Sequence, residues 1–411
     1  MGPTPGSARA ADDLAAMRAF GARRDGVPSR FTVDAVTSFD AFLALESAWT
    51  ELVSASGVAH PFLTHAWIRS WWEAFGAEAR LHVLVAREGG AVAAIAPFMR
   101  VRRRMYGLAV RSLELVANPH TPQSGILESR DAPGASRAIL DHLLDCDGTW
   151  DIVTLSQLAA EGETMAEIQR LSRGRNLPFG IWPALRSPYV EMTGDWESYE
   201  RSLRRKHRSN IRNRLARLER LGTVRLEAVG PDDDFSAALE EGLRIEAAAW
   251  KAAAGSAILS EPGSARFYRG LAERLGRRGE LALSFLSVGG RRIAFHYSLR
   301  HGERLFLLKP GYDPDFAEYS PGSLLLYLTV QDAFAKGIRE FDLAGDCDGW
   351  KMQWTRATRP YAWIFVFAPG LRARLIHGAK FRLVPWLRRR ERAGRAATSP
   401  ISTDSETEPC M

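Results

Sequence analysis

The chain has 411 residues, 46% of them apolar, which is enough for about two or three globular domains with sizeable cores. Its three cysteines, Cys146, Cys347 and Cys410, lie far apart with no paired spacing, which argues against a disulfide scaffold or a zinc site and favours a reducing compartment. No segment approaches the roughly 18 to 20 apolar residues of a membrane-spanning helix, and the N-terminal region lacks the apolar core of a secretory signal. We therefore expect a cytoplasmic protein.

The net charge of +7 is concentrated in two basic segments. Residues 201–220 and residues 371–395 each carry a net charge of +8, which leaves the rest of the chain at −9. The globular body is therefore acidic. This argues against a protein that serves only to bind nucleic acid, and no DNA partner is expected.

Hydrophobic periodicity and turn residues predict the elements of the first half. After a disordered leader at residues 1–28, the predicted elements are a strand at 31–36, helices at 39–55 and 64–75, a hairpin at 81–100, short strands at 113–116 and 125–127, a helix at 133–144 and a strand at 151–155.

The second half repeats this alternation of strands and helices. Its predicted elements are a basic helix at 204–220, a strand at 223–229, helices at 235–254 and 264–275, a hairpin at 281–300, a strand at 304–308, a loop at 309–313, a helix from Pro321, and strands at 340–343 and 361–367.

An internal repeat links the two halves. Residues 81–100 and 281–300 align without gaps at an offset of 200, and both read as strand, Gly-Gly turn and strand. Each hairpin also follows a predicted helix. We therefore predict an α/β (α+β) fold of two similar tandem domains, each a mixed sheet flanked by helices. The predicted limits are 29–185 for the first domain, 186–370 for the second, 371–395 for a basic amphipathic segment and 396–411 for a disordered tail.

The turn Ser320-Pro321-Gly322 follows the strand at 304–308 and opens an apolar helix. Free amides and the positive dipole end of a first helical turn bind phosphate groups, and glycine lets a ligand approach the backbone. The alternative is that Ser320 is an ordinary N-cap.

An ordered series of residues in the second half resembles a known family. The series is Tyr199, Leu203, Arg204, Lys206, Arg208, Ile211, Arg212, Glu246, Trp250, Lys251, Ala294, Tyr312, Asp313, Ser320 to Leu325, Phe341, Asp342, Gly345, Trp350 and Lys351. It resembles the BioF2-like acetyltransferase domain of the GNAT superfamily, which is associated with cellulose and exopolysaccharide biosynthesis and is related to the tandem-GNAT FemAB peptidyltransferases. The resemblance spans about residues 199–367, and the first half is similar to the degenerate partner domain.

The resemblance implies direct acyl transfer in a ternary complex from a thioester, acetyl-CoA, to an amine or hydroxyl of a small-molecule or glycan-precursor acceptor, without a metal. The cofactor would contact Leu307, Leu308, Lys309, Ser320, Pro321, Gly322 and Ser323. Family members usually carry Arg/Gln-x-x-Gly-x-Gly/Ala at the pyrophosphate loop, whereas this chain has fewer glycines. An aminoacyl-tRNA donor, as in the peptidyltransferases, therefore stays open.

Acyl transfer needs a base for the acceptor and a positive group for the developing charge. His296 alternates onto the more polar face of its strand, and Glu246 lies one turn from Trp250. Asp342 ends a strand, at the sheet edge where ligand sites gather. The alternatives are a structural histidine and an exposed glutamate beside a packed tryptophan.

Lys351, next to Trp350, is the candidate electrophilic group. Alternatively it neutralises the acids around it, which include Asp346. Cys347 lies between two aspartates, which would raise its thiol pKa, so it is rejected as a nucleophile.

The basic helix has a narrow apolar stripe of Leu203, Ile211, Leu215, Leu218 and Leu221. Its crowded cations favour an anionic ligand, such as a nucleotide-linked or lipid-pyrophosphate acceptor, the 3′-phosphate of CoA, or tRNA. The candidate substrate and anion contacts are Arg204, Lys206, Arg208, Arg212, Trp250, Lys251, Tyr312, Asp346 and Trp350.

The second basic segment, 371–395, mixes arginines with leucines and a tryptophan. This pattern suits peripheral contact with the anionic inner membrane, or a terminal helix packed on the domain. A non-catalytic membrane- or nucleic-acid-binding protein is the hypothesis from a different functional class.

Overall fold

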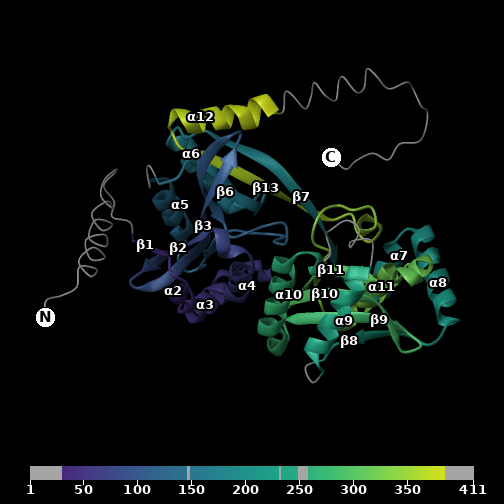
Figure 1. Ribbon diagram of the computed structural model, residues 1–411. Helices are drawn as coiled ribbons and strands as arrows, with labels where there is room; N and C mark the ends of the chain where they lie inside the picture. Colours follow the sequence, from purple (N-terminus) through teal and green to yellow (C-terminus); the bar gives the residue numbers. More distant parts are fainter. Residues whose placement is uncertain (1–29, 146–148, 231–232, 249–257, 385–411) are drawn as a thin grey trace, which may run out of the picture.

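The computed structural model describes residues 30–145, 149–230, 233–248 and 258–384 (Figure 1). The first half contains β1 (Thr32–Val36), α2 (Phe39–Leu43), α3 (Glu46–Ser56), α4 (His65–Phe75), β2 (Arg80–Glu88), β3 (Ala91–Met105), β4 (Leu108–Leu115), β5 (Leu127–Glu128), α5 (Ala135–Asp145), β6 (Ile152–Ala159), α6 (Glu163–Gly174) and β7 (Phe179–Glu191).

The second half contains α7 (Trp196–Ser202), α8 (Arg205–Glu219), β8 (Val224–Ala228), α9 (Phe235–Ala248), α10 (Pro262–Leu275), β9 (Leu281–Val288), β10 (Arg291–His301), β11 (Arg304–Tyr312), α11 (Pro321–Ala335), β12 (Glu340–Asp342), β13 (Thr358–Phe367) and α12 (Leu371–Gly378). Each predicted strand and helix within the described residues has a counterpart, but the single helix predicted at 39–55 is two helices, α2 and α3. Three elements, α6, β7 and α7, were missed.

The two halves repeat the same structure, which confirms the predicted tandem fold. Each hairpin carries a β-bulge at the equivalent residue, Ala93 in the first and Ile293 in the second, an offset of 200 positions. Both Gly-Gly turns have positive φ angles, as a tight hairpin requires. Helices α4 and α10 lie side by side between the halves (Figure 1). Trp67 of α4 packs edge-to-face on Phe267 of α10, its equivalent by the same offset, with ring centroids 5.0 Å apart.

The strands form one hydrogen-bonded path in the order β1-β2-β3-β4-β6-β13-β7-β12-β11-β10-β9-β8. β13 belongs to the second half by sequence, yet it pairs antiparallel with β6 and β7. β7 is shared between the halves, because residues 179–188 pair with β13 and residues 189–191 pair with β12. The predicted domain boundary between residues 185 and 186 falls inside this strand, and the domain limits stay a prediction.

Helices cover both faces of the strands. A common core joins α3 and α4 to α9 and α10 and includes Trp49, Trp67, Phe267 and Phe285, all fully buried. On the opposite face, α5 and α6 cover the first half, while α7, α8 and α11 cover the second. In the described part of the chain, no helix is long and apolar enough to cross a bilayer.

Strand β11 is longer than predicted, and the expectation of a loop at 309–313 is wrong up to Tyr312. Leu308 is bulged, since Leu307 and Lys309 face consecutive residues of β10. The chain then continues as strand under α9. A Cβ added at Gly311 would lie 2.5 Å from the Cα of Glu246, so glycine is required where the helix crosses.

We expect Gly311→Ala to lower the free energy of unfolding by about 2 to 3 kcal/mol, because the new methyl group would overlap the backbone of α9. The measurement is urea denaturation. Gly174→Ala is the matched control, since a Cβ there meets nothing within 4 Å and alanine favours the helix it ends. Equal stability of Gly311→Ala and wild type would contradict the close approach.

Candidate active site

The parallel strands β11 and β12 separate after three paired residues. The last pair joins Phe306 to Asp342. β11 continues to its end at Tyr312, whereas the chain after β12 stays with β7, where the amide of Leu343 donates to the carbonyl of Pro188 at 2.9 Å. The bulge at Leu308 interrupts the pairing of β11 with β10, on the other edge of the strand. Beyond Phe306, β11 no longer pairs with β12, so a gap in strand pairing begins there.

The turn at Ser320 opens α11 beside this gap. Ser320 has φ +49° and ψ +56°, and its hydroxyl makes no capping hydrogen bond, so the alternative of an ordinary N-cap is wrong. The amides of Ser323 and Leu324 bond to the Ser320 carbonyl. A Cβ at Gly322 would meet only the ring of Tyr312, at 3.7 Å. Binding of an anionic group at this helix N-terminus stays a prediction.

Helix α8 runs along α11 and reaches this turn with a residue that the sequence analysis did not select. The Arg217 guanidinium lies 5.1 Å from the ring centroid of Tyr319 and is ion-paired with Glu318. Arg212 is ion-paired with Glu200 at 3.0 Å, and Glu200 also accepts from Tyr327 of α11. Of the cations in α8, Arg217 is therefore the one placed beside Ser320.

The other predicted cations of this segment lie at the opposite end of α8. There Arg204 and Lys206 are exposed, and His207 packs edge-on against Trp354 with ring centroids 4.7 Å apart. His207 is buried and joins Leu203, Ile211 and Leu218 on the docked face, which the sequence analysis had not foreseen. Burial lowers the pKa of His207. Leu221, which was predicted in the apolar stripe, is instead 54% exposed, because it follows the end of the helix.

A cavity of about 440 Å³ lies between the halves, next to the last β11–β12 pair. Both halves contribute to its wall. Its lining residues are Val58, Ala59, His60, Gln123, Ala159, Ala160, Glu161, Gly162, Arg304, Phe306, Asp342, Arg359, Pro360 and Tyr361.

Asp342 is the predicted catalytic residue that this cavity contains. It is 4% exposed, and its Oδ1 accepts from the Ser187 hydroxyl and the Ala344 amide, each at 2.8 Å. Its Oδ2 accepts from Arg359 at a longer 3.3 Å. Burial raises the pKa of the carboxyl. Oδ2 is thus the less bonded oxygen of a carboxylate that takes up protons readily.

Arg359 connects two buried carboxylates on β12. It makes a two-pronged ion pair with Glu340 and a second bond to Asp342, and it lies 3.8 Å from the ring centroid of Tyr189. Arg304 adds a bond to Glu340 at 3.3 Å. Two guanidinium groups of the wall therefore bind two buried carboxylates, Asp342 in the wall and Glu340 outside it, and these charges offset each other's desolvation.

His60 brings a neutral imidazole from the first half. Its Nδ1 is buried and has no hydrogen-bond partner among the described residues. Burial is the largest cause that lowers the pKa of His60 to about 3, and the nearby His301, Arg304 and Arg359 contribute to the same shift. On the same wall, the Tyr361 hydroxyl donates to Gln123 at 3.0 Å. These groups suit hydrogen bonding to a hydroxylated or amine ligand.

Lys351 is buried in the loop after β12. Its Nζ donates to the carbonyls of Ala344 at 2.7 Å and Asp346 at 3.1 Å, and it is ion-paired with Asp348 at 2.9 Å. An ammonium group has three donors, and all three hold the loop. Trp350 is 37% exposed and lies 5.4 Å from the same ammonium.

Two further predicted catalytic residues lie outside the cavity lining, Glu246 on α9 and His296 on β10. Glu246 is fully buried, and its Oε2 accepts from the amide of Ile258 at 2.9 Å. His296 is 1% exposed, opposite Ser284 and Pro310 in neighbouring strands. Alternation along β10 is as predicted, with Phe295 and Tyr297 in the core under α9 and α10. Trp250 and Lys251 lie outside the described residues.

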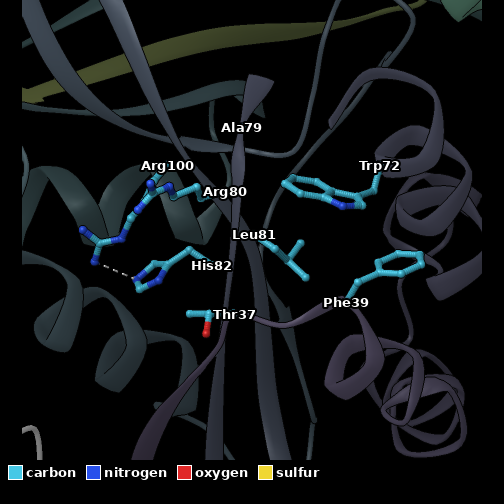
Figure 2. A pocket seen from close by; sticks show the side chains of 8 residues that line it. All are labelled: Thr37, Phe39, Trp72, Ala79, Arg80, Leu81, His82 and Arg100. Atoms are coloured by element: carbon cyan, nitrogen blue, oxygen red, sulfur yellow. Dashed lines mark hydrogen bonds between the residues drawn. The ribbon is translucent and has the colours of Figure 1, made fainter. Parts of the chain in front are cut away.

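A second cavity, of about 430 Å³, lies in the first half and contains none of the predicted residues. Figure 2 shows its lining side chains. Arg80 and His82 project from one side of β2, with His82 bonded to Arg100, whereas Leu81, Trp72 and Phe39 lie on the other side. The polar and apolar side chains therefore lie on opposite sides of β2, and this second cavity does not bring together the groups of a reaction centre. Among the described residues, no group of three or more His, Cys, Asp or Glu side chains is placed to hold a metal ion.

Residues 205–352 match the family model described as an acetyltransferase (GNAT) domain. This segment contains α8, the β11–β12 divergence, the Ser320 turn and Lys351. This segment is therefore similar to the GNAT acetyltransferase domain. No curated protein sequence matches it.

Solved structures share the fold of the whole described chain. FemX has a TM-score of 0.55 at 10% identity, covering 84% of this chain and 100% of FemX. The C-terminal domain of a putative lysylphosphatidylglycerol synthetase from Agrobacterium fabrum has a TM-score of 0.50 at 12% identity, covering 82% and 96% of the two chains. A tandem GNAT protein from the clavulanic acid biosynthesis pathway has a TM-score of 0.44 at 12% identity, covering 83% and 99%. These structures share the fold, and the match of residues 205–352 to the acetyltransferase model supports acyl transfer as the reaction class.

Sequence reasoning missed most of the cavity wall. His60, Gln123, Arg304, Arg359 and Tyr361 belong to segments far apart in the chain, and only the pairing of β13 with β7 brings Arg359 to Asp342. Arg359 and Pro360 come just before a predicted strand, and the sequence around them contains no motif that indicates a site.

We expect the wild type to lose stability relative to His60→Gln as the pH falls. The folded pKa of His60, about 3, lies below the ordinary value of 6.5, so the unfolded chain alone binds this proton in that interval. Between about pH 7 and pH 5 the wild type should lose about 2 kcal/mol more than the variant. Urea denaturation at both pH values gives this difference. Parallel losses would show that His60 is protonated in the folded protein.

Proposed function

We propose that this protein is an acyl-CoA-dependent N- or O-acyltransferase whose donor is acetyl-CoA. The observation that carries the proposal is the divergence of β11 and β12 beside the uncapped N-terminus of α11, within the segment that matches the GNAT domain. Edges of separated strands offer backbone groups to an extended thioester arm, and the helix end favours phosphate.

Each part of the donor has a place in this arrangement. The pantetheine arm would lie along residues 307–309, and the pyrophosphate would lie at Gly322, where an added Cβ would meet only the Tyr312 ring. Arg217 lies beside the turn and would pair with a further phosphate, such as the 3′-phosphate of CoA. When bound, the thioester supplies the activated acyl group.

The acceptor would occupy the cavity between the halves. The cavity meets the strand divergence at Phe306 and Asp342, so an acceptor there would approach the end of the donor arm. His60, Gln123 and Tyr361 offer neutral hydrogen-bonding groups, and Arg304 offers a cation. This lining favours a sugar or an amine, including an amino sugar, as in the metabolism of surface polysaccharides.

Asp342 is the residue we assign as general base. Its raised pKa favours taking a proton from the acceptor, and Oδ2 is the oxygen with the weaker existing bond. Lys351 would keep the loop at Asp346 in place rather than touch the reacting atoms. Transfer would be direct, because the Cys347 thiol donates to the carbonyl of Arg186 and lies between two aspartates.

We expect Gly322→Asp to weaken acetyl-CoA binding at least about tenfold without loss of stability. A carboxylate at the first turn repels phosphate, yet it stabilises the helix by about 0.3 to 1 kcal/mol. Isothermal titration with acetyl-CoA measures the affinity, and thermal unfolding measures the stability.

Gly322→Ala is the control for this variant, since its methyl group makes only an ordinary contact with Tyr312. If acetyl-CoA and CoA both fail to bind the wild type, the proposed donor is wrong. Stabilisation by total aminoacyl-tRNA alone would instead support the FemAB-type transferase, which is the second candidate on the sequence resemblance.

We expect Gln123→Ala to raise the KM for the acceptor about fivefold to tenfold, as the loss of one hydrogen bond predicts, and to leave the Kd for acetyl-CoA unchanged. The assay measures release of CoA thiol over a panel of amino sugars and amines. Gln169→Ala on α6, outside the cavity, is the matched control. An unchanged KM would remove the acceptor from this cavity.

A further inference from the structure

Helix α12 and the π-helical turn after it (Ala379–Leu383) form an outer layer over β7 and β13 (Figure 1). The inner face is firmly docked. Lys380 is buried, with its ammonium 3.6 Å from the ring centroid of Trp182 and 3.9 Å from that of Phe365. Phe381 fills the space where a Cβ on Gly180 would lie, 2.4 Å away. Burial lowers the pKa of Lys380 to about 8.

The outer face exposes leucines. Leu371 is 76% exposed, Leu375 is 62% exposed and Leu383 is 51% exposed. Leu371 and Leu375 are one turn apart, and a π turn is longer than an α turn, so it keeps Leu383 on the same side of the segment. This spacing makes a continuous apolar stripe rather than scattered surface residues.

Arginines flank this stripe. Arg372, Arg374 and Arg382 are exposed, and Arg372 is near enough to Asp151 to help lower the pKa of that carboxyl. Residues 371–384 contain no acidic residue, and residues 385–395 add five arginines and a tryptophan to the sequence. The face is therefore apolar in the middle and cationic at its margins.

Such a face fits one kind of occupant. A second copy of the chain would bring like charges together, and a nucleic acid would leave the leucines in water. A bilayer with anionic lipids accommodates both the leucines and the arginines. The leucines enter the boundary between headgroups and acyl chains, and the arginines contact the anionic headgroups. We propose that the outer face of residues 371–383 binds peripherally to anionic membranes.

Binding in this way would leave the candidate active site accessible. α12 lies over β6, β13 and β7, on the first half, whereas α8, α9 and α11 lie at the other end of the molecule (Figure 1). The surface is also independent of the acyl-transfer proposal, because none of its residues lines the cavity or the Ser320 turn.

The test is sedimentation of the full chain with vesicles of phosphatidylcholine, with and without about 30 mol% phosphatidylglycerol. We expect the partition coefficient of the wild type to be at least about tenfold higher on the anionic vesicles than on the neutral ones. The double variant Leu371→Asp/Leu375→Asp should have a partition coefficient on anionic vesicles at least about tenfold below that of the wild type. In the double variant Arg372→Gln/Arg374→Gln, partitioning onto anionic vesicles should fall about fivefold for each arginine removed, and it should depend less on salt concentration.

Leu221→Asp is the matched control, because Leu221 is a 54% exposed leucine that follows α8 at the other end of the molecule. It should bind as the wild type does, and thermal unfolding should show that all variants are folded. Equal binding of the wild type and Leu371→Asp/Leu375→Asp overturns the proposal. So does equal pelleting with both vesicle types, or binding to RNA without binding to anionic vesicles.

Discussion

The hydrogen bonding of β7 to strands of both halves is the constraint on which the rest of the structure depends. Its first ten residues pair with β13, and its last three pair with β12. The strand therefore fixes the position of the acyltransferase half against the partner half, together with the α4–α10 helix pair. It also brings Ser187 of β7 and Arg359 of β13 to Asp342. Ser187 and Asp342 are more than 150 positions apart in the chain.

The pairing of β13 with β6 and β7 explains how a buried carboxylate is stabilised in the centre of the molecule. Asp342 and Glu340 are nearly fully buried, and a buried charge without a partner is strongly destabilising. Arg359 and Arg304 supply the compensating charges from neighbouring strands. The same arrangement leaves Asp342 at the cavity wall with a raised pKa, so the requirement for stability and the proposed chemistry meet in one network.

The two basic segments differ in their structural surroundings. α8 is docked along α11, and its arginines extend from Trp354 at one end to Tyr319 at the other, next to the proposed phosphate site. α12 is docked on β7 and β13 and directs leucines as well as arginines outward. The two segments have the same net charge in the sequence, but we interpret them differently. The apolar residues beside the arginines distinguish the two cases.

The sequence by itself determined the elements and the repeat. The period of apolar residues and the Gly-Gly turns identify both hairpins, and the Ser320 turn lies where a helix begins, because these signals act over a few residues. β7 was missed because Pro183 and Pro188 are unusual inside a strand.

Only the tertiary structure decided which strands pair and what meets Asp342. The pairing of β13 with β6 and β7, the crossing of α9 over Gly311 and the approach of His60 to Arg359 join segments that are distant in the chain. Such contacts depend on packing of the whole sheet rather than on local preference. The sequence could therefore select Asp342 and Gly322 as candidates from their local settings, while the cavity beside Asp342 exists only in the folded molecule.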